Sequence, residues 1–85
     1  MTVLDEERCR ELVGKLCSGL GWSVRERTDI RYVLLNRAGG WITFGQSMAE
    51  IAMSLCEQPP SYAIPEWMLE CSSPEELALK AEVAL

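Results

Sequence analysis

The chain has 85 residues, 48% apolar and 25% charged, and its 8 basic and 13 acidic side chains give a net charge of −5. A chain of this length folds as one domain with a small core, which leaves little room for an enclosed active site. The acidic balance argues against phosphate backbones or anionic membranes as the main partner. We expect one compact domain over residues 1–85.

The sequence contains no histidine. This excludes Ser-His-Asp and Cys-His catalysis and mixed Cys and His zinc sites within the chain. The acidic pairs Glu6-Glu7 and Glu75-Glu76 lie where helices are expected to begin, and the helix dipole accounts for carboxylates there. Gly39-Gly40 is too short for a phosphate-binding loop. We therefore predict a protein that is not an enzyme and has no cofactor and no metal site.

The cysteines are Cys9, Cys17, Cys56 and Cys71, and none form a C-x-x-C pair. Cys9 and Cys17 lie eight residues apart on one expected helix, about 12 Å along its axis, which is too far for a disulfide. We predict reduced thiols that pack as small apolar side chains, while a bridge from Cys56 to Cys71 stays open.

No apolar stretch approaches the roughly 20 residues of a membrane helix. The first fifteen residues carry four acidic side chains instead of a basic start followed by an apolar segment. The sequence therefore predicts a cytoplasmic protein without a membrane partner.

The first predicted helix spans residues 3–18, with Thr2 as its N-cap and Gly19 as its C-terminal glycine. Its apolar positions follow the i, i+3, i+4 spacing of one helix face, and they are Cys9, Leu12, Val13, Leu16, Cys17 and Leu20.

Between residues 22 and 44 the apolar period shortens to two. The segments 22–27, 31–37 and 41–44 are separated by turn-forming residues at 28–29 and 38–40. This pattern predicts a three-stranded antiparallel sheet, or one long hairpin if the first turn is only a bulge.

Ser47 and Glu50 form a capping-box pattern that predicts a helix over residues 48–57, ended by Pro59-Pro60. Pro65 favours a short helical turn, and Ser73-Pro74 begins a last helix that runs to residue 85. The fold class is therefore α+β, in the order α-β-β-β-α-(short α)-α, with the helices packed mainly on one face of the sheet.

Charge is unevenly distributed, since residues 21–45 sum to +2 and residues 46–85 to −6. One set of residues shares odd parity within the strands and can line one sheet face, and it consists of Arg25, Arg27, Arg31, Arg37 and Trp41. Trp41 has the parity opposite to Ile42 and Phe44. Arginine beside an aromatic ring favours a partner-binding surface. The alternative is a solvated face neutralised by weak surface ion pairs.

Of the three tryptophans we expect at least two in the core.

The last helix has two apolar sides, and one short helix can turn only one of them fully onto its own core. Leu79 and Val83 lie on the second side. We expect this side to contact another chain, in the simplest case a second copy.

The order of one helix, three strands and one helix resembles the topology of double-stranded RNA-binding domains. That family places lysines across the phosphates at the start of its second helix, where this chain has Met48, Ala49 and Glu50. The resemblance thus implies a nucleic-acid-binding alternative that fails at the residues that would perform it.

These observations predict a small non-enzymatic protein-binding module, a cytosolic adaptor or inhibitor of a larger protein, and the size and acidity fit a chain from a bacterium or a phage. Its binding residues would come from the arginine and tryptophan face. The alternative function is a structural homodimer subunit that associates through its C-terminal helix.

Overall fold

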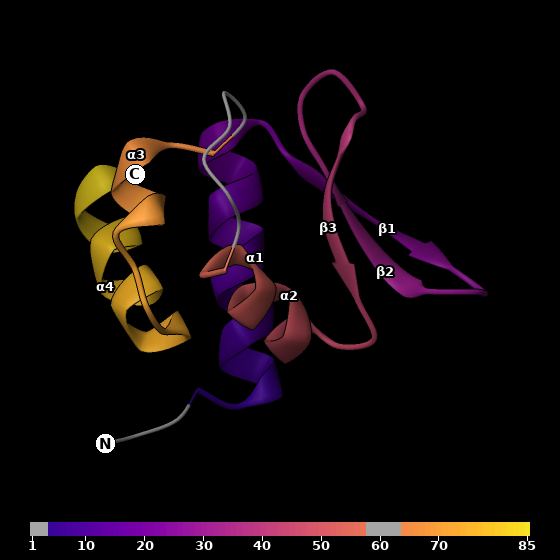
Figure 1. Ribbon diagram of the computed structural model, residues 1–85, viewed down its shortest axis with the longest axis horizontal. Coiled ribbons are helices and arrows are strands. Elements are labelled where there is room, and N and C mark those ends of the chain that lie inside the picture. Colours follow the sequence, from indigo (N-terminus) through magenta and orange to yellow (C-terminus); the bar gives the residue numbers. More distant parts are fainter. Residues whose placement is uncertain (1–3, 58–63) are drawn as a thin grey trace.

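The computed structural model describes residues 4–57 and 64–85 of the chain, and it has the predicted α+β fold (Figure 1). In chain order its elements are α1 (Glu6–Leu20), β1 (Ser23–Arg27), β2 (Arg31–Leu35), β3 (Trp41–Gly45), α2 (Met48–Leu55), α3 (Glu66–Leu69) and α4 (Pro74–Ala84).

The strands form one antiparallel sheet in the order β1-β2-β3, which confirms the meander. On the middle strand, Tyr32 and Leu34 join the helix-covered core. Val33 lies between Arg25 and Phe44 in the register, on the opposite face. The pairing of β2 with β3 is irregular between Leu34 and Leu35, where a bulge shifts the register by one residue.

All described helices lie on the same side of the sheet (Figure 1). α2 packs against both β3 and α1, and α4 packs against α1 and α3, so the helices form two successive layers. The core cluster draws on every layer, and its fully buried members include Leu16, Leu34, Ile51, Met68 and Leu77.

The first helix is displaced from the prediction at both ends. It begins at Glu6, and the Asp5 side chain accepts the N–H of Arg8, so Asp5 is the N-cap. The predicted cap, Thr2, lies outside the described residues. The helix ends at Leu20, and its C-cap Gly21 has φ 77° and takes the left-handed conformation predicted for Gly19.

Gly19 instead lies inside the helix, directly under Leu85. A Cβ atom at Gly19 would come within 2.7 Å of the Leu85 side chain. The C-terminal end of α4 is therefore held against α1 by a contact for which a glycine leaves room.

The starts of α2 and α4 are as predicted, whereas α3 begins one residue late, because Pro65 is its extended N-cap and not its first helical residue. Ser47 accepts the N–H of Glu50, and Ser73 accepts the N–H of Glu76, with Pro74 at the first helical position. α2 ends at Leu55, two residues before the predicted limit. The predicted stop at Pro59-Pro60 lies outside the described residues.

Candidate functional site

Two aromatic rings lie side by side on the face of the sheet that the described helices leave open. The side chain of Trp41 is 52% exposed and that of Phe44 56%, and their ring centroids are 6.2 Å apart in an edge-to-face arrangement. Val33 and Leu35 are buried beneath this layer. We call the surface made of Arg25, Arg27, Val33, Leu35, Trp41 and Phe44 the sheet face.

Arg27 is positioned from both sides on the sheet face. Its guanidinium carbon lies 5.3 Å from the centroid of the Trp41 ring, within the range of a cation–π contact. Asp29 binds the same guanidinium with both carboxylate oxygens, at 2.9 Å from Nε and 3.0 Å from Nη2. The Arg27 hydrogen bonds lower the pKa of Asp29. The exposed indole of Trp41 therefore lies beside a guanidinium group whose orientation Asp29 fixes.

The surface between these groups is hollowed. An open hollow of about 470 Å³ is lined by Arg25 and Arg27 from β1, by Val33 and Leu35 from β2, and by Trp41 from β3. It combines an apolar floor, one aromatic wall and two guanidinium groups, and Glu26 and Gly39 complete its lining.

The prediction that Phe44 lies on the face opposite to Trp41 is wrong, because β3 contains a bulge. Trp41 pairs with Leu35 while Phe44 pairs with Val33, so both rings come to the same face three residues apart. Ile42, which shares the parity of Phe44, packs against the core. A residue inserted by a bulge breaks the alternation on which the prediction depended.

Arg31 does not belong to the sheet face. It is the first residue of β2 and pairs with Arg27, but its φ of 87° is left-handed, which breaks the regular alternation of side chains at this end of the strand. Its guanidinium carbon lies 5.5 Å from the centroid of the Tyr32 ring, whose side chain faces the helices. The hydroxyl of Tyr32 also accepts a hydrogen bond from Arg10 on α1 at 3.4 Å.

Arg37 is also outside the sheet face, because β2 ends at Leu35. It lies in the turn between β2 and β3, and its Nε is 2.7 Å from where a Cβ of Gly21 would be. Only Arg25, Arg27 and Trp41 of the predicted set are brought together.

The second predicted surface lies on α4. Leu79 is 67% exposed and Val83 is 90% exposed, whereas Leu77 and Ala81 are fully buried on the opposite side. Leu79 and Val83 line an open hollow of about 400 Å³ with Trp67, Lys80 and Ala84, which we call the α4 face. Of the seven predicted binding residues, three thus lie on the sheet face and two on the α4 face, while Arg31 and Arg37 lie on neither.

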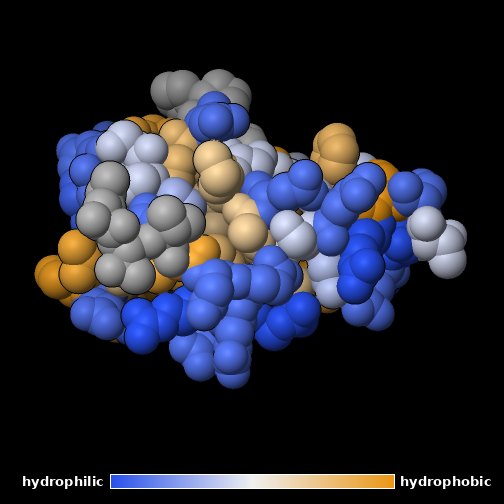
Figure 2. All heavy atoms as spheres, turned by 90° about the horizontal axis from the view of Figure 1, so that it is seen from below, coloured by the Kyte–Doolittle hydropathy of each residue, from blue (hydrophilic) through white to orange (hydrophobic). Residues whose placement is uncertain are grey.

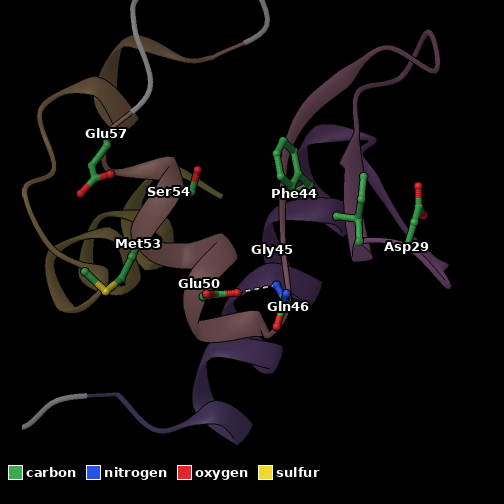
Figure 3. Close-up of a pocket in the computed structure, with 9 residues that line it drawn as sticks. Asp29, Phe44, Gly45, Gln46, Glu50, Met53, Ser54 and Glu57 are labelled. Atoms are coloured by element: carbon green, nitrogen blue, oxygen red, sulfur yellow. Dashed lines mark hydrogen bonds between the residues drawn. The ribbon is translucent and has the colours of Figure 1, made fainter.

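The sequence interpretation missed a groove between β3 and α2 (Figure 3). Asp29 and Phe44 form its sheet side, and Glu50, Met53, Ser54 and Glu57 form its α2 side, around a volume of about 500 Å³. Met53 is 55% exposed. The sequence contains one indication of this groove, because Met53 is an apolar residue outside the buried apolar stripe of α2.

Hydrophilic residues cover much of the molecule in the view from below, and hydrophobic residues reach the surface at the helix end and the sheet end (Figure 2). Among the described residues, no cluster of three or more Cys, Asp or Glu side chains could hold a metal ion. All four cysteines are free thiols, and burial raises the pKa of each, that of Cys56 to about 11.

No family model, curated protein or solved structure matches this chain. Within residues 4–57 and 64–85, every helix is too short or too polar to cross a bilayer.

Proposed function

We propose that this protein is a non-enzymatic protein-binding module, a cytosolic adaptor or inhibitor from a bacterium or phage that uses its sheet face to cover part of a larger protein. The observation that carries the proposal is the exposed pair of Trp41 and Phe44 with Arg27 held over the indole. Exposed aromatic rings beside arginine are the composition of binding hot spots.

The chemistry of this surface favours a partner that presents carboxylates around an apolar side chain. Arg25 and Arg27 offer planar donors that can pair with carboxylates, and the rings supply apolar area at a small cost in side-chain entropy. Because Asp29 already directs the Arg27 guanidinium, less ordering is needed when a partner binds.

Nucleic acid is a weaker fit, because the N-terminus of α2 already holds an anion. The carboxylate of Glu6 accepts the N–H of Met48 at 2.8 Å and the N–H of Ala49 at 3.0 Å. A phosphate at this helix end would have to displace a carboxylate of the same chain.

Affinity capture with immobilised protein tests the proposal. The double variant Trp41→Thr/Phe44→Thr removes both rings with residues that favour strands, so the sheet is expected to remain folded. We expect the wild type to retain a specific protein from its host lysate, the double variant to lose it, and the control Leu79→Gln/Val83→Gln to keep it. Retention of the same protein by the Trp41→Thr/Phe44→Thr variant would contradict the proposal.

A second candidate function, a homodimer that associates through the α4 face, is favoured by one observation. Leu79 and Val83 are exposed and line one hollow with Trp67. The Nζ of Lys80 donates to a carboxylate oxygen of Glu70 at 3.0 Å, so the charge of Lys80 is paired and the hollow is mainly apolar. Such a surface fits a second apolar helix face.

A further inference from the structure

We infer that the groove between β3 and α2 binds a cationic segment of the partner, one that places a Lys or Arg next to an apolar side chain. This inference rests on the proposed function, because it names the chemistry of a partner segment that would extend past the sheet face. The two surfaces are continuous, since Phe44 belongs to both.

The apolar part of the groove comes from both of its walls. Phe44 on β3 and Ile30 in the turn between β1 and β2 line one side, and Met53 lines the α2 rim, with Phe44 and Met53 each more than half exposed. A flexible methionine at the rim can adapt to apolar side chains of different shape. These residues provide a receptor for one apolar side chain.

The charge around this apolar part is negative. The groove is lined by Asp29, Glu50 and Glu57 and by no basic residue. Arg27 neutralises Asp29, and the carboxylate of Glu50 accepts the backbone N–H of Gln46 at the start of α2 (Figure 3). The ion pairs among the described residues do not include Glu57, so its carboxylate is the uncompensated charge on the α2 wall.

The direction of α2 adds to this negative charge. Glu57 follows the C-terminal end of the helix, where the helix dipole is negative, and the last turn of α2 contains no basic residue. A cation at this end would interact favourably with both Glu57 and the negative helix terminus. A neutral or acidic segment would gain no such interaction. Charge complementarity thus selects a cationic occupant.

A titration with two synthetic probes tests the inference directly. The first is a capped hexapeptide of alternating lysine and leucine, and the second has glutamate in place of each lysine. Amide resonances of ¹⁵N-labelled protein report where each probe binds. We expect the lysine peptide to shift Phe44, Ser54 and Glu57, and the glutamate peptide to leave them unchanged.

Charge reversal at the groove supplies the matched comparison. Glu57→Lys should weaken binding of the lysine peptide about three- to tenfold, the size expected when one exposed ion pair becomes a like-charge contact. Glu82→Lys makes the same change on α4, on the far side of α1 from the sheet, and should leave the affinity unchanged.

Three results would overturn the inference: no shifts at the groove, equal binding of both peptides, or equal weakening by both charge reversals. These outcomes are separate from failure of the proposed function. A groove that binds neither peptide, in a protein whose partner capture still depends on Trp41 and Phe44, would reject the inference alone.

Discussion

The guanidinium of Arg27 stacks over the indole of Trp41, 5.3 Å from the ring centroid, although the two residues lie on the two outer strands of the sheet. The contact crosses the middle strand and covers its buried side chains, Val33 and Leu35. One arrangement therefore has two consequences. It shields the small apolar layer of the open face, and it holds a cation and an aromatic ring ready for a partner.

The contact between Glu6 and the start of α2 should make stability depend on pH. Burial raises the pKa of Glu6, but hydrogen bonds from the N–H groups of Met48 and Ala49, helped by Arg10, outweigh this and lower the pKa below its ordinary value of 4.5. Because the folded pKa is depressed, the contribution to stability is present above pH 4.5 and is lost as the pH falls through the folded pKa.

The measurement is the melting temperature of wild type and Glu6→Gln as a function of pH. We expect the variant to melt lower at neutral pH and the two curves to converge in acid. Glu7→Gln, a neutralisation of an exposed neighbour, controls for net charge. A constant difference between Glu6→Gln and wild type at all pH values would show that the carboxylate charge is unimportant.

Two glycines of α1 should respond differently to alanine. A Cβ at Gly14 meets nothing within 4 Å, so Gly14→Ala should stabilise the protein by about 0.5–1 kcal/mol through helix propensity. A Cβ at Gly19 displaces Leu85, so Gly19→Ala should stabilise less and should speed amide exchange at residues 83–85. Chemical denaturation and hydrogen exchange measure both effects. Identical exchange at residues 83–85 in the two variants would refute the packing of Leu85 on Gly19.

All four thiols should be reduced and protonated at neutral pH. Burial raises the pKa of each, and that of Cys56 is about 11, so the folded protein should react slowly with a thiol reagent at pH 8 and faster as the pH rises. In denaturant without reductant, titration should find four thiols. Only two titratable thiols, or a stoichiometric metal in elemental analysis, would contradict this expectation.

The α4 face can be tested without knowledge of a partner. Because Leu79 and Val83 are already exposed, Leu79→Glu/Val83→Glu should keep the fold, with a stability change within about 0.5 kcal/mol per site. If the protein self-associates through this face, sedimentation should show dimer for wild type and monomer for the variant. Wild type that stays monomeric at high concentration would exclude the homodimer.

Most of the fold follows from local patterns in the sequence. Apolar spacing located the helices, and the caps at Ser47 and Ser73 gave two helix starts correctly. The start of α1 was placed too early, because Thr2 and Asp5 both have cap-forming side chains. Only tertiary packing distinguishes them: the observed start places Glu6 against the N-terminus of α2.

The site was less predictable, because it depends on two irregularities of the sheet. A bulge next to Leu35 moved Phe44 to the open face, and a positive φ took Arg31 away from it. Neither has a reliable local signal, since an arginine at a left-handed position is uncommon and a bulge depends on the partner strand. The exposure of Leu79 and Val83 was predicted, because it needs only helix periodicity.

The most direct test of the central claim is the dissociation constant of the captured partner for wild type and for Trp41→Thr/Phe44→Thr, measured by calorimetry with circular dichroism as the check on folding. If the sheet face is the binding surface, the folded variant should lose about 2–4 kcal/mol of binding free energy, as expected when two hot-spot rings are removed. A variant that is folded and binds the partner with the affinity of wild type would show that the sheet face is not the binding surface.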